Sequence, residues 1–292
     1  MSDDSKIEWT EATWSPVTGC DKVSPGCGLP RFDGDDTGGC YAMALAKRLK
    51  AMGSAKYQND GDPRTSGPGF GVTVHPDSLE VPLRWRKPKR VFVNSMSDLY
   101  HARVPVSFIA QVFITMARTP QHTYQILTKR PERQLAIVGD DLDGGYRLLE
   151  ETINEDEARA LYDRWPLPNV HLGTSIELDR YTRRADDLRQ TSAAVRFLSL
   201  EPLLGPLPSL DLTGIDWCII GGESGPDARE MDLGWARELL AQCRDAGVAP
   251  FIKQLGSVWA RDNGGGKGGD WERWPADLMV REFPADAEVI TV

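Results

Sequence analysis

The chain has 292 residues, enough for two average domains or for one (β/α)8 barrel of about 250 residues. Its 40% hydrophobic and 26% charged residues are typical of a globular chain and exclude a mainly disordered or fibrous protein. The 34 basic and 43 acidic residues give a net charge of −9, so any nucleic-acid site must be a local basic patch.

The start of the chain, from Met1 to Trp9, has neither the basic nor the apolar region of a signal peptide. No stretch approaches the roughly 18 apolar residues that span a bilayer. The five cysteines are an odd number in a large chain, which argues against a secreted disulfide scaffold. We therefore expect a soluble, cytoplasmic protein with reduced thiols and no membrane partner.

Strand-like and helix-like segments alternate along the chain. The expected strands are residues 7–14, 70–75, 90–96, 123–128, 170–175, 195–201, 217–222 and 250–255. The expected helices are residues 41–52, 79–86, 106–118, 132–138, 179–191 and 233–246. Strict alternation of the two predicts parallel strands joined by right-handed crossovers.

Eight strands over this length favour an α/β fold of the (β/α)8 TIM-barrel type, built as a single domain. An open doubly wound sheet would give a similar pattern and is the alternative. Insertions are expected near residues 28–39, 55–69 and 139–169, with a flexible glycine-rich segment near residues 262–270. We find no internal repeat and no second folding unit.

Three cysteines, Cys20, Cys27 and Cys40, lie between the first expected strand and the first expected helix. In a barrel this loop lies at the carboxyl ends of the strands, where active sites of this fold are built. Clustered thiolates favour zinc, copper(I) or an iron–sulfur centre. Three thiols leave one position open, either on a [4Fe-4S] cluster or for a histidine that completes a zinc site, with His75 as the candidate. Cys218 and Cys243 are expected to be buried in the core.

The residues around these cysteines resemble the radical S-adenosylmethionine (SAM) proteins. They resemble more closely a phage-associated and bacterial family of unknown function with a Trp-Asn-Pro-x-Thr-Gly-Cys opening and a Cys-x6-Cys-x2-Cys-Tyr motif. Residues 14–20 match that opening with Ser15 in place of asparagine, and Cys40 comes ten residues later than the family spacing. The other matching segments are residues 94–99, 127–131, 173–175, 200–204 and 221–224.

The resemblance implies a (β/α)8-like barrel, or an open or partial barrel of the radical SAM type, in which Cys20, Cys27 and Cys40 hold a [4Fe-4S] cluster. The open iron would bind the amino and carboxylate groups of SAM. An external electron donor would reduce the cluster, and a 5′-deoxyadenosyl radical would abstract hydrogen from an unknown substrate. A phage context implies a nucleobase in DNA or a nucleotide as substrate, with Lys47, Arg48 and residues 84–90 as local phosphate contacts.

Polar residues at the ends of the expected strands are the candidates for contact with cofactor and substrate. The expected catalytic residues are Asp98, Lys129, Glu201 and Glu223. The expected cofactor-binding residues are Asn94, Ser95, Ser97, Thr174, Ser175, Gly221 and Gly222. Lys129 and Arg130 form a local basic patch, and strand alternation turns one of Lys253 and Gln254 inward. Each has a structural alternative, such as a helix cap for Asp98 or charge neutralisation for Lys129.

Two other functions fit the same residues. The cysteines could bind zinc in a degenerate barrel that acts as a non-enzymatic binding module. A metal-free hydrolase using Asp98, Glu201 and Glu223 would require that all three cysteines be dispensable.

Overall fold

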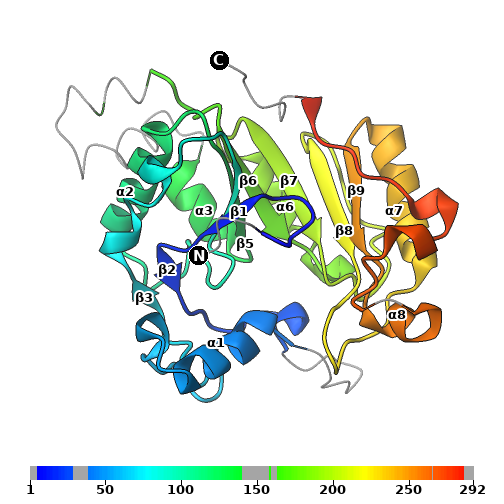
Figure 1. Ribbon diagram of the computed structural model, residues 1–292. Coiled ribbons are helices and arrows are strands. Elements are labelled where there is room, and N and C mark those ends of the chain that lie inside the picture. Colours follow the sequence, from blue (N-terminus) through cyan, green and yellow to red (C-terminus); the bar gives the residue numbers. More distant parts are fainter. Residues whose placement is uncertain (1–4, 29–38, 140–157, 159–162, 265, 286–292) are drawn as a thin grey trace.

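The centre of the molecule is a seven-stranded, entirely parallel sheet (Figure 1). The computed structural model describes residues 5–28, 39–139, 158, 163–264 and 266–285. The strands, in their order across the sheet, are β1 (Ala12–Trp14), β4 (Arg90–Val93), β5 (Thr123–Thr128), β6 (Val170–Ser175), β7 (Val195–Leu200), β8 (Trp217–Gly221) and β9 (Ala249–Gln254). Parts of the expected insertions at residues 28–39 and 139–169, and of the segment 262–270, lie outside the described residues.

The sheet curls into a half-barrel, whereas we expected eight strands closed into a full barrel. The difference lies in residues 70–75, where only β3 (Thr73–Val74) is extended. This strand leaves the main sheet and pairs antiparallel with β2 (Val17–Thr18). Just before it, Gly67 and Gly69 take positive φ angles of 82° and 71°, which favour a turn over a strand. The α/β class and the parallel sheet are confirmed.

The helices follow the strands largely as expected. They are α1 (Tyr41–Ala51), α2 (Val106–Ala117), α3 (Pro131–Val138), α6 (Arg184–Arg189), α7 (Leu233–Ala246) and α8 (Ser257–Asn263). Two predictions were wrong in extent. Residues 79–86 form only a 3-10 turn at Pro82–Arg84, and residues 179–191 form a 3-10 turn, Asp179–Tyr181, followed by the short α6. Pro82 lacks the amide hydrogen that an α-helix would need there.

Helix α7 has the limits that the sequence predicts because both of its ends are capped. The Asp232 side chain accepts a hydrogen bond from the Gly234 amide at 2.7 Å. At the other end Gly247 adopts φ 69°, a left-handed conformation that glycine takes without steric cost. Its buried face consists of Ala236, Leu239, Leu240 and Cys243.

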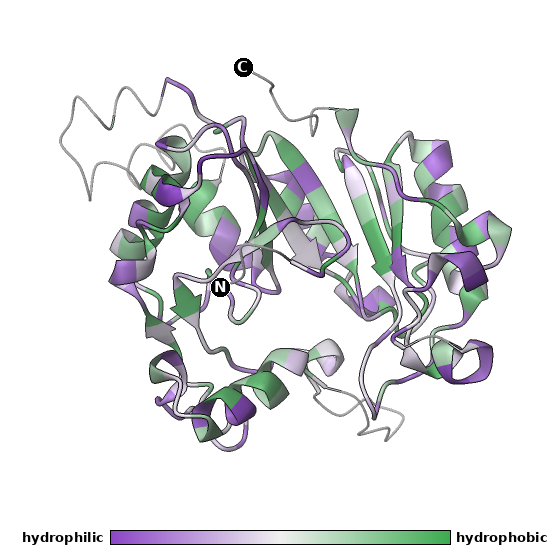
Figure 2. Ribbon diagram, in the orientation of Figure 1, coloured by the Kyte–Doolittle hydropathy of each residue, from purple (hydrophilic) through white to green (hydrophobic). Residues whose placement is uncertain are grey.

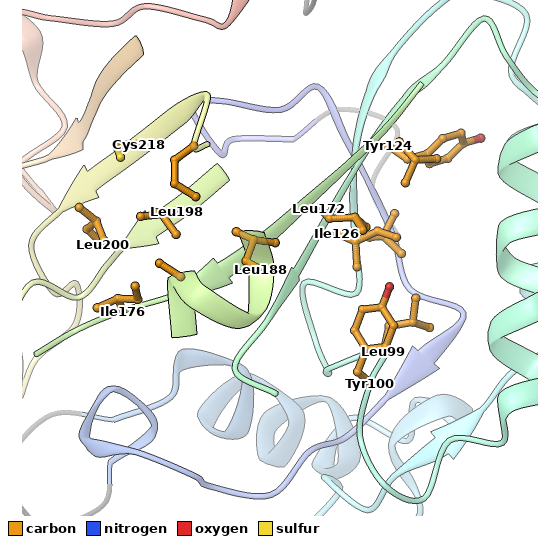
Figure 3. Close-up of a cluster of buried hydrophobic side chains, with 14 of the residues drawn as sticks. Leu99, Tyr100, Tyr124, Ile126, Leu172, Ile176, Leu188, Leu198, Leu200 and Cys218 are labelled. Carbon is orange, nitrogen blue, oxygen red and sulfur yellow. The ribbon is translucent and has the colours of Figure 1, made fainter. Parts of the chain in front are cut away.

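The outer face of the sheet packs against the helices in the main hydrophobic core. Figure 3 shows part of this layer, in which Ile126, Leu172 and Leu198 from neighbouring strands meet Leu188 of α6. In Figure 2 the strands are mostly hydrophobic in colour and the helices carry alternating hydrophobic and hydrophilic patches. Cys218 and Cys243 are fully buried in this core, as expected.

The inner face of the half-barrel is filled by a second, aromatic cluster. Its members are Trp9, Phe92, Phe197, Trp217, Ile219 and Phe251. Gly173 makes room for it, because a Cβ atom there would lie 2.5 Å from the Phe197 ring. The cluster fills the interior of the half-barrel below the carboxyl ends of the strands.

His171 lies on the same inner face, beside Gln125 of β5, and is 2% exposed. Burial lowers its pKa from 6.5 to about 4. The unfolded chain therefore binds a proton below about pH 6.5 that the folded chain does not, and stability falls as the pH is lowered. We expect the free energy of unfolding to drop between about pH 7 and about pH 5 by about 2 kcal/mol more in the wild type than in His171→Gln. Urea denaturation measures this, and equal pH slopes would contradict it.

Candidate active site

A cavity of about 370 Å³ opens at the carboxyl ends of the strands. Its wall comes from the cysteine loop that follows β1, from the start of α1, and from the ends of β4 to β9. Figure 1 shows α1 beneath this edge of the sheet. This is the place where the sequence pattern predicted a site, and a cavity of this size is in the range of small-ligand pockets.

Most of the predicted site residues meet at this cavity. Those that line it are Cys20, Cys27, Cys40, Asn94, Ser95, Ser97, Asp98, Lys129, Ser175, Glu201 and Glu223. Thr174, Gly221 and Gly222 are not among its lining residues. The Thr174 hydroxyl donates to the Thr128 carbonyl at 3.0 Å, and a Cβ at Gly222 would lie 2.7 Å from the Leu255 carbonyl oxygen. Gly221 is the last residue of β8, and Thr174 and Gly222 lie against neighbouring segments of the chain.

Cys20 and Cys40 are half-buried at the cavity wall. Burial, together with the Asp98 carboxylate, raises the pKa of Cys20 to about 12 against the opposing effect of Arg130. Burial and the neighbouring Cys27 also raise the pKa of Cys40. Without a bound cation these two thiols are therefore protonated at neutral pH, and a metal that binds them must displace their protons.

The cysteine side chains do not form a preassembled metal site. Within residues 5–28, 39–139, 158, 163–264 and 266–285, no three His, Cys, Asp or Glu side chains form a group that could hold a metal ion. His75, the candidate fourth zinc ligand, instead makes a 2.8 Å hydrogen bond with the Thr18 hydroxyl. Burial and Lys56 lower its pKa to about 4.

Asp98 accepts four hydrogen bonds and holds Arg130 against the cysteine loop. Its Oδ1 accepts from the Thr128 hydroxyl at 2.7 Å and its Oδ2 accepts from Arg130 Nη1 at 2.9 Å. Backbone amides of Tyr100 and Lys129 supply the other two bonds. Arg130 then donates from Nη1 to Cys20 Sγ at 3.3 Å and from Nη2 to the Asp21 carbonyl at 3.0 Å.

Glu223, after β8, forms a second buried pair of this kind with Arg229. Their side chains are 5% and 3% exposed, and Arg229 binds both carboxylate oxygens, at 2.7 and 2.8 Å. The pair reaches the cysteine loop at two points. Arg229 Nη2 donates to the Pro25 carbonyl at 3.1 Å, and Glu223 Oε1 accepts from the Gly39 amide at 3.1 Å.

A third pair joins Glu177, two residues after β6, to Arg184 of α6 at 3.0 Å. Glu177 Oε1 also accepts from the Gly26 amide at 3.3 Å. Burial raises the pKa of Glu177, but Lys129, Arg184, the Ser24 hydroxyl and the Gly26 amide together lower it, so the group is ionised. Sequence reasoning missed Glu177, although its place just after Gly173-Thr174-Ser175 marked it as a strand-end residue.

Three carboxylates from three different strand ends therefore hold the cysteine loop, each with its own arginine. Two of them, Asp98 and Glu223, were expected to be catalytic. Their oxygens are occupied by hydrogen bonds within the protein, which suits a positioning role better than proton transfer.

Glu201, after β7, has a different environment. It pairs with Lys253 of β9, whose ammonium lies 2.7 and 2.8 Å from the two carboxylate oxygens. Gln254 Nε2 donates to Glu201 Oε1 at 3.0 Å. A shift in strand register at Ile220/Gly221 lets both Lys253 and Gln254 reach Glu201 and the cavity, where simple alternation had predicted only one.

Asn94, after β4, has φ 65°, the only positive value at a non-glycine position among the described residues. Its Oδ1 accepts from the Val17 amide at 3.3 Å, while its buried Nδ2 has no partner in the described part of the chain. The Ser97 hydroxyl donates to the Val17 carbonyl at 2.8 Å, and the Tyr41 hydroxyl donates to the Ser95 carbonyl. These contacts fix the cysteine loop and α1 to the end of β4.

Three of the basic residues expected to contact phosphate are engaged elsewhere. Arg84 pairs with Glu80 and Arg90 lies 3.5 Å from Glu11, while Lys89 lies over the Trp85 ring. Lys47 and Arg48 are exposed on α1. Lys129 remains at the cavity wall, within electrostatic reach of Glu177 and Cys40.

Comparison with known proteins gives a family without an assigned activity. In the part of the chain that the structure describes, no helix is long and apolar enough to cross a membrane. No curated protein and no solved structure matches the chain. The model of a family described as a protein of unknown function (DUF5131) matches residues 4–283, nearly the whole chain, and the protein therefore belongs to that family.

Proposed function

We propose that this protein is a radical SAM-type enzyme in which Cys20, Cys27 and Cys40 hold a [4Fe-4S] cluster. The observation that carries the proposal is that three thiols of one loop line the same cavity as the strand-end polar residues. When bound, the cluster and SAM supply one-electron cleavage of a carbon–sulfur bond and hydrogen abstraction from a substrate, with an external donor providing the electron.

The donor set fits such a cluster. Three thiolates leave one iron free for a cosubstrate, and thiolates favour iron–sulfur centres over hard cations. The cavity of about 370 Å³ holds more than a single metal ion. Because the three thiols do not form a preassembled group among the described residues, the cysteine side chains have to move when the cluster is loaded.

The surrounding residues have distinct roles in this proposal. Arg130, at 3.3 Å from Cys20 Sγ, stabilises thiolate charge. Asn94, Ser95, Ser97 and Ser175 offer hydrogen bonds to SAM, and Lys129 offers a cation for an anionic group. Asp98, Glu177 and Glu223 position the loop. Glu201 and Lys253 remain for the substrate.

The rival function is a zinc-binding or degenerate barrel that acts as a binding module. The absence of an assembled metal group among the described residues does not separate the two, because a zinc site needs assembled ligands as much as a cluster does. The two functions differ in the metal that the cysteines hold, and analysis of the metal content distinguishes them.

The test is the iron, sulfide and zinc content of anaerobically reconstituted protein, measured for the wild type and Cys40→Ala. We expect about four irons per chain and a visible absorption that bleaches on reduction, both lost in the variant. Cys243→Ala is the matched control, because Cys243 is buried on α7 away from the cavity. Zinc in place of iron, or the same iron content in Cys40→Ala, would refute the proposed cluster.

A further inference from the structure

We infer that the corner of the cavity formed by Glu201, Lys253 and Gln254 is a substrate subsite for an uncharged nucleobase. The inference rests on the proposed function, since it names the substrate class for the same cavity. It starts from groups at the ends of β7 and β9 that do not hold the cysteine loop.

The charge of this corner argues against an ionic ligand group. Glu201 and Lys253 are 17% and 15% exposed and bind each other at 2.7 Å, so their charges compensate. Arg130, which also lines the cavity, is engaged by Asp98 and the loop. A phosphate or carboxylate would therefore find no unpaired cation among the described residues of this corner, whereas a neutral polar group costs less to desolvate there.

The hydrogen-bonding groups of the corner are both donors and acceptors. Gln254 is 1% exposed, and its Nε2 donates to the Gly222 carbonyl at 2.9 Å and to Glu201. Because both partners are acceptors, the orientation of the amide is fixed. Its Oε1 is then a buried acceptor without a partner among the described residues, and an unpaired buried acceptor is costly unless a ligand satisfies it.

Two serine hydroxyls line the same cavity. Ser175 of β6 and Ser199 of β7 are register partners on neighbouring strands, and both line the cavity. Among the described residues neither hydroxyl donates a hydrogen bond to the protein. The corner thus offers a lysine ammonium, a carboxylate and an amide oxygen, and the Ser199 hydroxyl lies two residues before Glu201 on the same side of the cavity wall.

One part of the cavity wall is apolar and includes two aromatic rings tilted by 57° to each other. Trp9 and Phe92 line the cavity with ring centroids 4.7 Å apart, and Leu127 lies on the next strand. A cavity lined by both aromatic rings and hydrogen-bonding groups suits a planar ring that carries donors and acceptors on its edge. Proteins that act on a nucleobase combine these two features, with hydrogen bonds to the base edge and stacking on side chains.

The test is calorimetric titration of the full chain with thymidine, cytidine and guanosine in saturating SAM, before and after cluster reconstitution. We expect a nucleoside to bind and deoxyribose 5-phosphate, which lacks the base, not to bind. Gln254→Leu and Glu201→Gln should each weaken binding by about tenfold, the effect of one lost hydrogen bond in a buried site. A single-stranded oligonucleotide in a parallel titration distinguishes a base within DNA from a free nucleoside.

Asp277→Asn, which alters an exposed ion pair away from the cavity, is the control and should bind as the wild type does. Thermal denaturation shows whether Gln254→Leu and Glu201→Gln fold. If either does not, Ser199→Ala provides a third variant with a smaller change. No nucleoside binding, or equal binding to all variants, would overturn the subsite. Nucleoside binding that depends on Gln254 in a protein that takes up no iron would refute the cluster and keep the subsite.

Discussion

Replacing Arg229 with methionine is expected to destabilise the folded protein by about 3–5 kcal/mol. The change leaves the Glu223 carboxylate buried without its cation, and it removes the hydrogen bond to the Pro25 carbonyl. An uncompensated buried charge is among the most costly single changes in a folded protein. Chemical denaturation of Arg229→Met beside the wild type measures the difference in the free energy of unfolding.

Two further variants separate charge burial from lost packing. Glu223→Gln combined with Arg229→Met removes the unpaired buried carboxylate. The double variant should therefore be more stable than Arg229→Met alone. Arg237→Met breaks a pair whose side chains are 46% and 55% exposed, so its cost should be much smaller than that of Arg229→Met. A loss of similar size in Arg229→Met and Arg237→Met would show that burial of the Glu223–Arg229 pair has no energetic consequence.

Cys27→Ala is expected to abolish reductive cleavage of SAM, because the proposed cluster would lose one of its three ligands. Cys27 is part of the cavity wall and lies close enough to Cys20 and Cys40 to affect the pKa of both. The measurement is the anaerobic formation of 5′-deoxyadenosine from SAM with a strong reductant. A variant that lacks the thiol should give no more product than a reaction without protein.

The control for this assay is Cys243→Ala, which removes a thiol from the core and leaves the cavity intact. It should retain cleavage if the protein folds, which its far-ultraviolet circular dichroism and thermal transition report. Cleavage by Cys27→Ala at the wild-type rate would exclude the proposed cluster. Loss of stability without any cleavage in the wild type would favour a zinc-binding or degenerate barrel.

Each of the three buried pairs connects a strand end to the cysteine loop, and together they indicate how the loop is held before any cofactor binds. Arg130, held by Asp98, donates hydrogen bonds to Cys20 and to the Asp21 carbonyl. Glu177 accepts a hydrogen bond from the Gly26 amide, and Glu223 accepts one from the Gly39 amide. A loop held at several points loses less conformational entropy when it binds a ligand. Carboxylates are therefore present near anionic thiolates because they hold the loop, and each of them is paired with an arginine that compensates its charge.

Sequence patterns predicted the alternating strands and placed the cysteine loop at their carboxyl ends, where the cavity lies. They also predicted the ends of α7, because its caps at Asp232 and Gly247 are local features. These predictions succeed because strand alternation, helix periodicity and capping depend on residues near each other in the chain. Residues 70–75 were assigned to the barrel because an apolar run does not reveal which strand it will pair with.

The roles of individual carboxylates were decided by the tertiary structure. Asp98, Glu201 and Glu223 look alike in the sequence, each at the end of a strand. Asp98 and Glu223 differ from Glu201 because the arginines beside them, Arg130 and Arg229, also reach the cysteine loop. Glu201 faces the cavity with Lys253 because a register shift turns Lys253 and Gln254 to the same side.

The sequence by itself therefore determined the fold class, the membership of the three cysteines in one loop and the edge of the sheet where that loop lies. Only the tertiary structure decided that the sheet is a seven-stranded half-barrel and that Glu177 belongs to the site. It also divided the polar residues between holding the loop and facing the cavity. The reason is that pairing between distant strands and the partner of a buried charge depend on contacts between residues far apart in the chain.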